Sequence, residues 1–311
     1  MRRIFLASAA LVACAAIDSA GAADLPPAEP PPVKAPVIAP IPVWSWSGCY
    51  VGINGGGTRG QNDAALSPGG LYLSPVGGLP PPNINGTGDT ASDIAALSNS
   101  YSMASNGWEA GGQVGCNAQW GMAVLGLEGD WQWTNTTTSA DASYPSFVTP
   151  GTAVPGSFTT PSHTEHVDVT QRWFATARVR AGFTPWERVL VYGTGGVAWA
   201  NFQSDTAVAF ATSPNFLAPY NGAVHVGSAS TNQVGWVVGG GLEWALTNNW
   251  SVKAEYLYLR FDGFAYASPL VAAAAPFAPG YAWNTSVTLR EQVARVGVNY
   301  KFDWGPVVAR Y

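Results

Sequence analysis

The sequence predicts an all-β fold, an eight-stranded antiparallel up-and-down transmembrane β-barrel. Three observations lead to this prediction. From residue 47 onward, apolar side chains recur at every second position, in runs separated by clusters of Gly, Pro, Asn and Ser. Only 11% of the residues are charged, whereas a soluble domain averages about 25%. Beyond residue 23, no apolar run reaches the ~18–20 residues that a membrane-spanning helix needs.

The composition also limits the function class. The mean hydropathy is only +0.07, so low charge is not accompanied by the long apolar blocks of a helical membrane protein. The low charge equally disfavours a cytosolic enzyme. The formal net charge is −5, which gives a nucleic-acid partner no electrostatic attraction.

The first 22 residues have the features of a signal peptide. Arg2 and Arg3 precede a short apolar stretch, and residues 20–22 form an A-x-A cleavage site. A second interpretation is a lipobox that ends at Cys14 and would place a lipid on that cysteine. The apolar stretch is too short for a membrane anchor.

The rest of the chain divides into a linker and one domain. Residues 23–46 are rich in Pro and predict a semi-rigid periplasmic linker, with a proline-recognising partner as the alternative. Residues 47–311 are the predicted outer-membrane barrel domain. This division places the chain in the cell outer membrane after export through the periplasm.

Eight runs of alternating residues are the predicted strands, and each holds the ~9–11 residues that a tilted spanning strand requires. In order, they cover residues 48–58, 107–120, 122–133, 167–183, 189–202, 234–246, 250–261 and 292–302. The fifth run is rich in Gly and its facing is ambiguous. The other seven set an apolar face against a polar one, as in Val51 against Asn54, Val114 against Gln113, Leu127 against Glu128, Val179 against Arg178, Leu242 against Glu243, Val252 against Lys253 and Val298 against Asn299.

The connections between the runs alternate in length. Tight turns are expected near Gly121 and at residues 184–187 and 247–249. Long polar segments separate the other pairs, at residues 59–106, 134–166, 203–233 and 262–291. Short periplasmic turns and long extracellular loops are typical of an outer-membrane barrel. An even number of strands also places both ends of the domain on the periplasmic side.

The two faces of these strands predict different surroundings. The apolar face meets lipid, because lipid cannot satisfy charged groups, and the charged face points into the barrel. Charges of both signs should pair there, since a buried unpaired charge is strongly unfavourable. The predicted interior charge network consists of Glu109, Glu128, Arg178, Arg180, Glu243, Lys253, Glu255 and Arg295. Asp130, Arg172 and Lys301 are expected on the same inward face, and the network is interpreted as structural filling rather than a catalytic site.

The tryptophans fall at two levels of the predicted wall. Trp120, Trp186 and Trp250 adjoin the short turns, whereas Trp108, Trp133, Trp199 and Trp236 lie near the long loops. Two aromatic girdles are expected where amphipathic rings meet lipid headgroups. A soluble sandwich with Trp in its core is the alternative, but it would need more charge on its solvent face.

Several segments carry a resemblance to a known family. The sequences WSWSGCYVG (44–52), VKAEYLY (252–258) and VARVGVNYKF (293–302) follow a Pro-rich leader. They resemble the small outer-membrane β-barrels of alphaproteobacteria, called outer membrane immunogenic proteins or porin-family proteins, with OmpA-like architecture. The resemblance implies a C-terminal assembly signal at Gly297, Tyr300 and Phe302 that the barrel-assembly machinery reads. The chain departs from the family by continuing to Tyr311, which is the alternative end of that signal.

Two cysteines also depart from the family, which usually has aromatic residues near these positions. Export would leave Cys49 and Cys116 in an oxidising compartment. The first two predicted strands are antiparallel neighbours, and both cysteines lie toward the short-turn ends on the lipid-facing side. We therefore predict a Cys49–Cys116 disulfide.

The sequence contains little that indicates catalysis or cofactor binding. It lacks a nucleophile elbow, a phosphate-binding loop and zinc-ligand spacing. The His163-x-Glu165-His166 segment is a weak metal candidate, so no catalytic residue, cofactor or metal is expected. The predicted function is a structural outer-membrane protein that contributes to envelope integrity and presents surface loops. A small-solute porin and a surface-loop binding protein or adhesin, with haem as one ligand class, are the alternatives.

The expected partners follow from this location. They are outer-membrane lipid and lipopolysaccharide, and the barrel-assembly machinery during biogenesis. The sequence does not identify a ligand for the surface loops or an oligomeric state.

Overall fold

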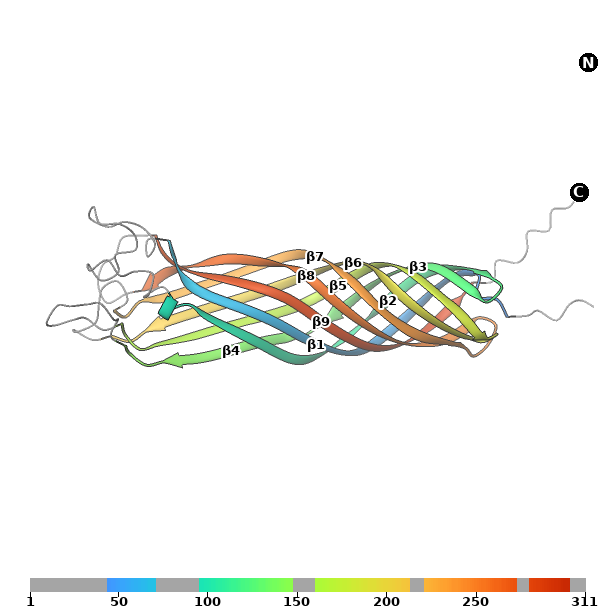
Figure 1. Ribbon diagram of the computed structural model, residues 1–311, viewed down its shortest axis with the longest axis horizontal. Coiled ribbons are helices and arrows are strands. Elements are labelled where there is room, and N and C mark those ends of the chain that lie inside the picture. Colours follow the sequence, from blue (N-terminus) through green and yellow to red (C-terminus); the bar gives the residue numbers. More distant parts are fainter. Residues whose placement is uncertain (1–43, 71–94, 148–159, 213–220, 273–279, 303–311) are drawn as a thin grey trace, which may run out of the picture. The chain divides into compact units, whose positions relative to one another are not determined.

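Nine antiparallel strands make up the described part of the chain. The computed structural model describes residues 44–70, 95–147, 160–212, 221–272 and 280–302. The strands, which run side by side in Figure 1, are β1 (Gly48–Gly70), β2 (Asn99–Trp120), β3 (Ala123–Thr134), β4 (Thr137–Tyr144), β5 (His163–Trp186), β6 (Val189–Phe210), β7 (Val224–Ala245), β8 (Trp250–Ala272) and β9 (Tyr281–Lys301). Within these residues, no helix is long and apolar enough to cross a membrane.

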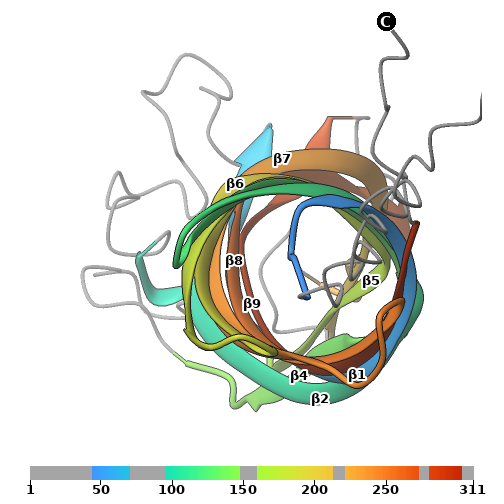
Figure 2. The same cartoon turned by 90° about the vertical axis from the view of Figure 1, so that its right-hand side faces the viewer.

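The nine strands form one sheet that closes on itself. Neighbouring strands follow the order β3-β2-β1-β9-β8-β7-β6-β5-β4, and an additional pairing joins β3 to β5. Figure 2 shows the resulting ring in end view. Closure removes the exposed strand edges that an open sheet would present to lipid, where backbone groups have no other partner.

The strand count differs from the eight predicted. Residues 123–133 of β3 pair with residues 173–183 of β5, and the whole of β4 pairs with the next part of β5, residues 163–170. The prediction treated the third strand as ending at Trp133. The chain instead breaks its pairing at Asn135 and Thr136 and resumes along the same neighbour. β4 therefore continues the third position of the wall, which raises the count to nine.

The strands are longer than predicted at the long-loop end. β1 reaches Gly70 instead of residue 58, and β9 begins at Tyr281 instead of residue 292. Parts of the expected loops 59–106, 134–166, 203–233 and 262–291 are therefore strand. The prediction missed them because their facing is inverted, with polar side chains outward and apolar side chains inward. Leu66, Val208 and Val287 are examples, and each is buried.

One predicted inward residue points outward. The pairing of β5 with β6 shifts register between Gln171 and Trp173. Because side chains alternate across a strand, one extra residue reverses the facing beyond it. Gln171 is therefore buried, whereas Arg172 is exposed and donates to Gln203 Oε1. The prediction that Arg172 faces inward was wrong for this reason.

The outer face of the ring carries a continuous apolar belt. Exposed aromatic side chains bound it at both levels that the sequence predicted, at Trp120, Trp186 and Trp250 near the turns and at Trp108, Trp133, Trp199 and Trp236 farther along. Exposed Val, Ile and Leu side chains lie between them, among them Ile53, Val114, Leu127, Val179, Leu242 and Val296. Such a belt between aromatic girdles matches the hydrocarbon layer and its two interfaces.

The tight connections join strands at the end where β1 begins. Gly121 lies between β2 and β3 and has a φ of 59°, a left-handed conformation that favours Gly. Residues 187–188 and 246–249 make the other two short turns. The predicted signal peptide with Cys14, residues 23–43 of the predicted linker, and residues 303–311 with Tyr311 lie outside the described residues.

Candidate functional site: the interior of the ring

The interior of the ring is occupied by side chains at three successive levels. An aromatic layer closes the short-turn end, a charged layer fills the middle, and an apolar layer fills the part that extends beyond the outer girdle. Each layer is built by a different stretch of the same strands. The interior is the candidate functional site because its filling decides what could pass through it.

Trp46 forms the first layer, at the short-turn end. Residues 44–47, in blue in Figure 2, turn into the opening of the ring instead of leaving it. Trp46 is buried and packs with Leu190, Tyr192 and Ala245. Its backbone N–H donates to Gln119 Oε1 over 2.7 Å, and its indole N–H donates to the Glu187 carbonyl over 3.2 Å. These bonds fix the ring across the opening.

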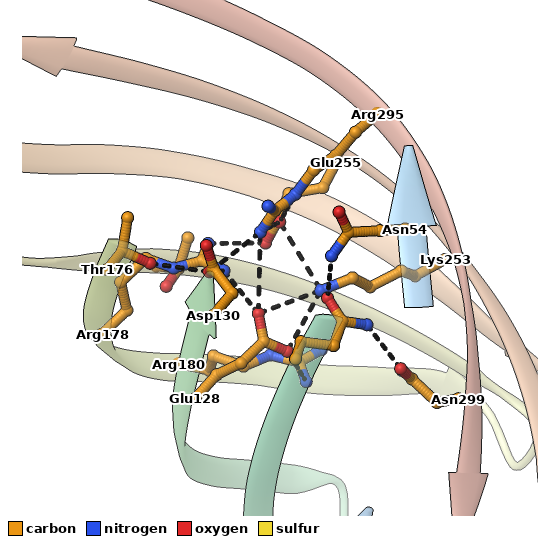
Figure 3. A network of polar contacts seen from close by, with 12 residues as sticks. Asn54, Glu128, Asp130, Thr176, Arg178, Arg180, Lys253, Glu255, Arg295 and Asn299 are labelled. Atoms are coloured by element: carbon orange, nitrogen blue, oxygen red, sulfur yellow. Dashed lines mark hydrogen bonds and ion pairs between the residues drawn. The ribbon is translucent and has the colours of Figure 1, made fainter. Parts of the chain in front are cut away.

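The charged layer follows Trp46 along the ring, and each of its charged side chains has a partner of opposite sign. Figure 3 shows the contacts around Glu128 and Asp130. Four cations and four carboxylates make its ion pairs: Arg178, Arg180, Lys253 and Arg295 with Glu128, Asp130, Glu243 and Glu255. All eight side chains are at most 3% exposed. Equal numbers of both signs offset the desolvation that isolated buried charges would suffer.

Glu128 is the centre of this charged layer. Its carboxylate accepts from Lys253 Nζ over 2.9 Å and from Arg180 over 3.2 Å, and it also pairs with Arg178. Tyr50 Oη donates over 2.6 Å to Oε2, the oxygen that also accepts from Arg180. Glu128 on β3 thereby joins β1, β5 and β8 across the interior.

A second set of contacts extends the layer toward Trp46. Arg180 pairs with Glu243 over 2.7 Å and lies over the Tyr192 ring, with its guanidinium carbon 3.9 Å from the ring centre. Ser251 and Asn299 both donate to Glu243 Oε1. The aromatic and charged layers are therefore continuous.

Glu109 faces the same interior but stands apart from these pairs. Its side chain is buried, and neither carboxylate oxygen has a hydrogen-bond partner among the described residues. The structure thus brings together seven of the eight residues predicted for the network and places Glu109 beside them.

The sequence reading missed the amides that complete the layer. Asn54 donates to Gln113 Oε1 over 2.8 Å, and Gln113 and Asn299 are also hydrogen-bonded. Each occupies an inward position of a predicted strand, so the alternation contained the signal. A network predicted from charged residues alone does not include them.

The third layer is a hydrophobic core that begins at the level of the outer girdle, where Val237 adjoins Trp236, and extends beyond it. It includes buried aromatic and aliphatic side chains from β1, β2, β5, β6, β7, β8 and β9. Among its members are Leu66, Met103, Phe174, Phe202, Phe210, Phe261, Trp283 and Leu289. Beyond the girdle, the wall has mostly polar side chains outside and apolar ones inside, which is the arrangement of a water-exposed sheet.

The three residues of the weak metal candidate are separated by strand alternation. His163 and Glu165 point inward, where Tyr101 donates to Glu165 and Asn99 donates to Glu165 Oε1 over 2.9 Å. His166 points outward and contacts Asp141 over 2.7 Å. The three side chains do not converge on one point.

The two cysteines are joined. Cys49 and Cys116 are directly opposite each other in the pairing of β1 with β2 and form a disulfide. Of the expected assembly signal, the Tyr300 ring lies 5.1 Å from Trp250 and 5.4 Å from Phe302. Gly297 lies on β9 opposite Asn54 and Lys253. The reading of these residues by the assembly machinery remains a prediction.

This chain is similar to known outer-membrane proteins. The family described as outer membrane protein beta-barrel domain matches residues 39–302. The 31 kDa outer-membrane immunogenic protein of Brucella melitensis biotype 1 is 32% identical over 259 residues, covering 83% of this chain and 86% of that protein. The 25 kDa outer-membrane immunogenic protein of Brucella abortus biovar 1 is 26% identical over 304 residues, covering 97% and 99%.

Solved structures that align with this chain have little sequence in common with it. The outer membrane protease OmpT from Escherichia coli aligns with a TM-score of 0.42 and 10% identity, over 85% of this chain and 99% of its own. OprG from Pseudomonas aeruginosa aligns with a TM-score of 0.38 and 11% identity, over 82% and 96%. On the family match and the Brucella relatives, this chain belongs to the alphaproteobacterial family of outer-membrane β-barrel proteins and is located in the outer membrane.

Proposed function

We propose that this protein is a closed structural barrel that contributes to the integrity of the outer membrane and does not conduct solutes. The observation that carries the proposal is the three-layered filling of the interior. Trp46, the balanced charge layer and the apolar core follow one another along the barrel. A solute path would have to cross all three.

The energetics of the charged layer support a closed state. Removing one partner from a buried ion pair costs about 3–5 kcal/mol, because the other charge is left uncompensated. An opening wide enough for a solute would separate several such pairs at once. The apolar layer adds a second barrier, since a polar solute would lose its hydration there.

A porin is the alternative function, and it requires a water-filled interior that side chains leave open. Porins of 16–18 strands leave an aqueous channel, whereas about eight strands leave an interior that side chains nearly fill. Here the inward positions carry large side chains, including Trp46, Arg180 and Trp283, all buried. These residues favour closure over conduction.

Planar-bilayer recording of the mature protein tests the proposal. We expect no stable single-channel conductance for the native barrel. A variant with Arg180→Ala and Glu243→Ala removes one whole ion pair and keeps the charge layer balanced, and it should also fail to conduct because Trp46 and the apolar core still block the path. Stable conductance and solute flux through the native barrel would overturn the proposal in favour of a porin.

The envelope role has its own test in cells. A strain without the protein should become more sensitive to detergents that the outer membrane normally excludes. Complementation with the native chain should restore resistance. Unchanged sensitivity after deletion would contradict a contribution to integrity.

A further inference from the structure

Three arginines gather on one side of the outer face, just beyond the apolar belt. Arg260 on β8 is directly opposite Arg290 on β9 and, on its other side, Trp236 on β7. Arg59 on β1 is opposite Gln292, two residues from Arg290 on the same strand. Among outer-face arginines of the described strands, only Arg172 lies elsewhere.

The arrangement leaves positive charge uncompensated. Arg290 pairs with Asp63, but Arg59 and Arg260 are exposed and make no ion pair with any residue that the structure describes. Like charges directly opposite each other in neighbouring strands destabilise a sheet. An anion placed between the arginines would remove this repulsion, and Arg binds phosphate through paired N–H donors.

A groove lies on the same strands within the apolar belt. It has a volume of about 690 Å³, and Ile53, Leu242, Val252 and Val296 are among the side chains that line it. Gly55 and Ala254 also line this groove. A second hollow of about 490 Å³ shares Gly55, Leu242, Ala254 and Val296 with the groove and adds Tyr256 and Ala294.

Small residues leave the way open from the groove toward the arginines. The next row of the sheet contains Gly57, Ala294 and Tyr256 side by side. A Cβ atom at Gly57 would meet no atom closer than 3.9 Å. Tyr256 Oη donates to Gln292 Oε1 over 2.7 Å, at the level where the surface changes from apolar to polar. From the groove outward along β1 and β9, the side chains on this face are therefore apolar first, then small, then cationic.

We propose that the outer face of β8, β9 and β1 binds a phosphorylated glycolipid of the outer leaflet, the lipid A part of lipopolysaccharide. Its phosphate lies among Arg59, Arg260 and Arg290, and an acyl chain occupies the groove. The arginines lie toward the ends that carry the long connections, which is the extracellular side of an up-and-down barrel. Asp63 and Asp262 lie farther from the groove than Arg59 and Arg260 do, along β1 and β8 respectively. The arginines are therefore the charged residues nearer to the apolar belt.

Native mass spectrometry of the purified full-length protein in neutral detergent tests this site. Lipid A is titrated in its phosphorylated form and after removal of its phosphates, and inorganic phosphate is added as a competitor. We expect one phosphorylated lipid per barrel, at least tenfold weaker binding of the dephosphorylated form, and no competition by millimolar inorganic phosphate.

Three variants locate the site. Arg59→Gln with Arg260→Gln should weaken binding of phosphorylated lipid A at least tenfold, and Gly57→Leu should weaken binding of both forms by placing a bulky side chain in the row between the groove and the arginines. Arg172→Gln, an exposed arginine on β5, is the matched control and should bind like the native protein. Gel mobility of unheated samples verifies that each variant is folded.

Four results would overturn the proposal. They are equal binding of the two lipid forms, binding by the double arginine variant that equals binding by Arg172→Gln, normal binding by Gly57→Leu, and full competition by inorganic phosphate. The last result would assign the arginines to a free anion. None of these results depends on whether the barrel conducts.

Discussion

At the scale of single residues, two buried glutamates in one interior have opposite relations to their surroundings. Glu128 accepts from Lys253 and Arg180 and pairs with Arg178, whereas Glu109 has no hydrogen-bond partner among the described side chains. Both are buried within the same ring. The contribution of a buried carboxylate to stability therefore depends on its partners and not on its burial.

We expect Glu128→Gln to lower the free energy of unfolding by about 3–5 kcal/mol, because three cations lose a shared partner. Glu109→Gln has the same change in charge and size and is the matched control. It should cost less than about 1 kcal/mol or stabilise the protein, since it removes a charge without breaking a hydrogen bond. Urea unfolding in phospholipid vesicles, followed by Trp fluorescence, measures both. Equal losses would contradict this account.

At the scale of elements, the strand segments beyond the outer girdle behave like a water-soluble sheet with its own core. His225 near the start of β7 belongs to this part, 11 residues before Trp236 and so about 35 Å along the strand. It is fully buried, and its ring centre lies 5.8 Å from that of Trp283. Burial lowers the pKa of His225 to about 4, from an ordinary value of 6.5.

This pKa shift predicts a loss of stability in acid. Above pH 6.5 the imidazole is neutral in both states, so its burial carries no protonation penalty. Between pH 6.5 and about 4 the unfolded chain binds a proton that the folded chain does not, which removes up to about 3 kcal/mol. His225→Gln should lose less stability than the native protein across this range, whereas His166→Gln, at an exposed position, should follow it. Parallel pH profiles for native protein and His225→Gln would contradict the prediction.

The sequence predicted the membrane part of each element well and the outer part poorly. Within the belt, lipid allows only apolar side chains outside, so Val179 and Arg178 could be assigned to opposite faces from alternation alone. Beyond the belt, water favours polar side chains on the outer face. The polar composition of segments such as 59–70 therefore predicts loops where the structure has strand. The bulge at Arg172 was also beyond prediction, because one extra residue reverses facing without changing composition. The amides Gln113 and Asn299 were on the predicted face but were not recognised as part of the site.

At the scale of the whole molecule, closure through the β3–β5 pairing gives every described strand except β4 two paired neighbours. β1 is paired with β2 on one side and with β9 on the other, so it joins the first part of the described chain to the last. The Cys49–Cys116 disulfide lies at the start of β1, near the short-turn end. It therefore constrains the unfolded chain while adding little to a pairing that the folded sheet already holds.

We expect loss of this disulfide to lower stability and leave the folded state unchanged. Cross-linking residues separated by 67 positions reduces the entropy of the unfolded chain by an amount worth about 4 kcal/mol at 25 °C in the chain-entropy estimate. A Cys49→Ser/Cys116→Ser variant should unfold at lower urea concentration by up to that amount. Its unheated gel mobility and its lack of conductance should match those of the native barrel, because the backbone pairs of β1 with β2 and the charged layer remain.

Reducing agent should lower the stability of the native protein and leave the variant unaffected. Equal urea midpoints would show that the unfolded chain is already held compact near these residues, and conductance by the variant would show that the cross-link helps to hold the interior closed.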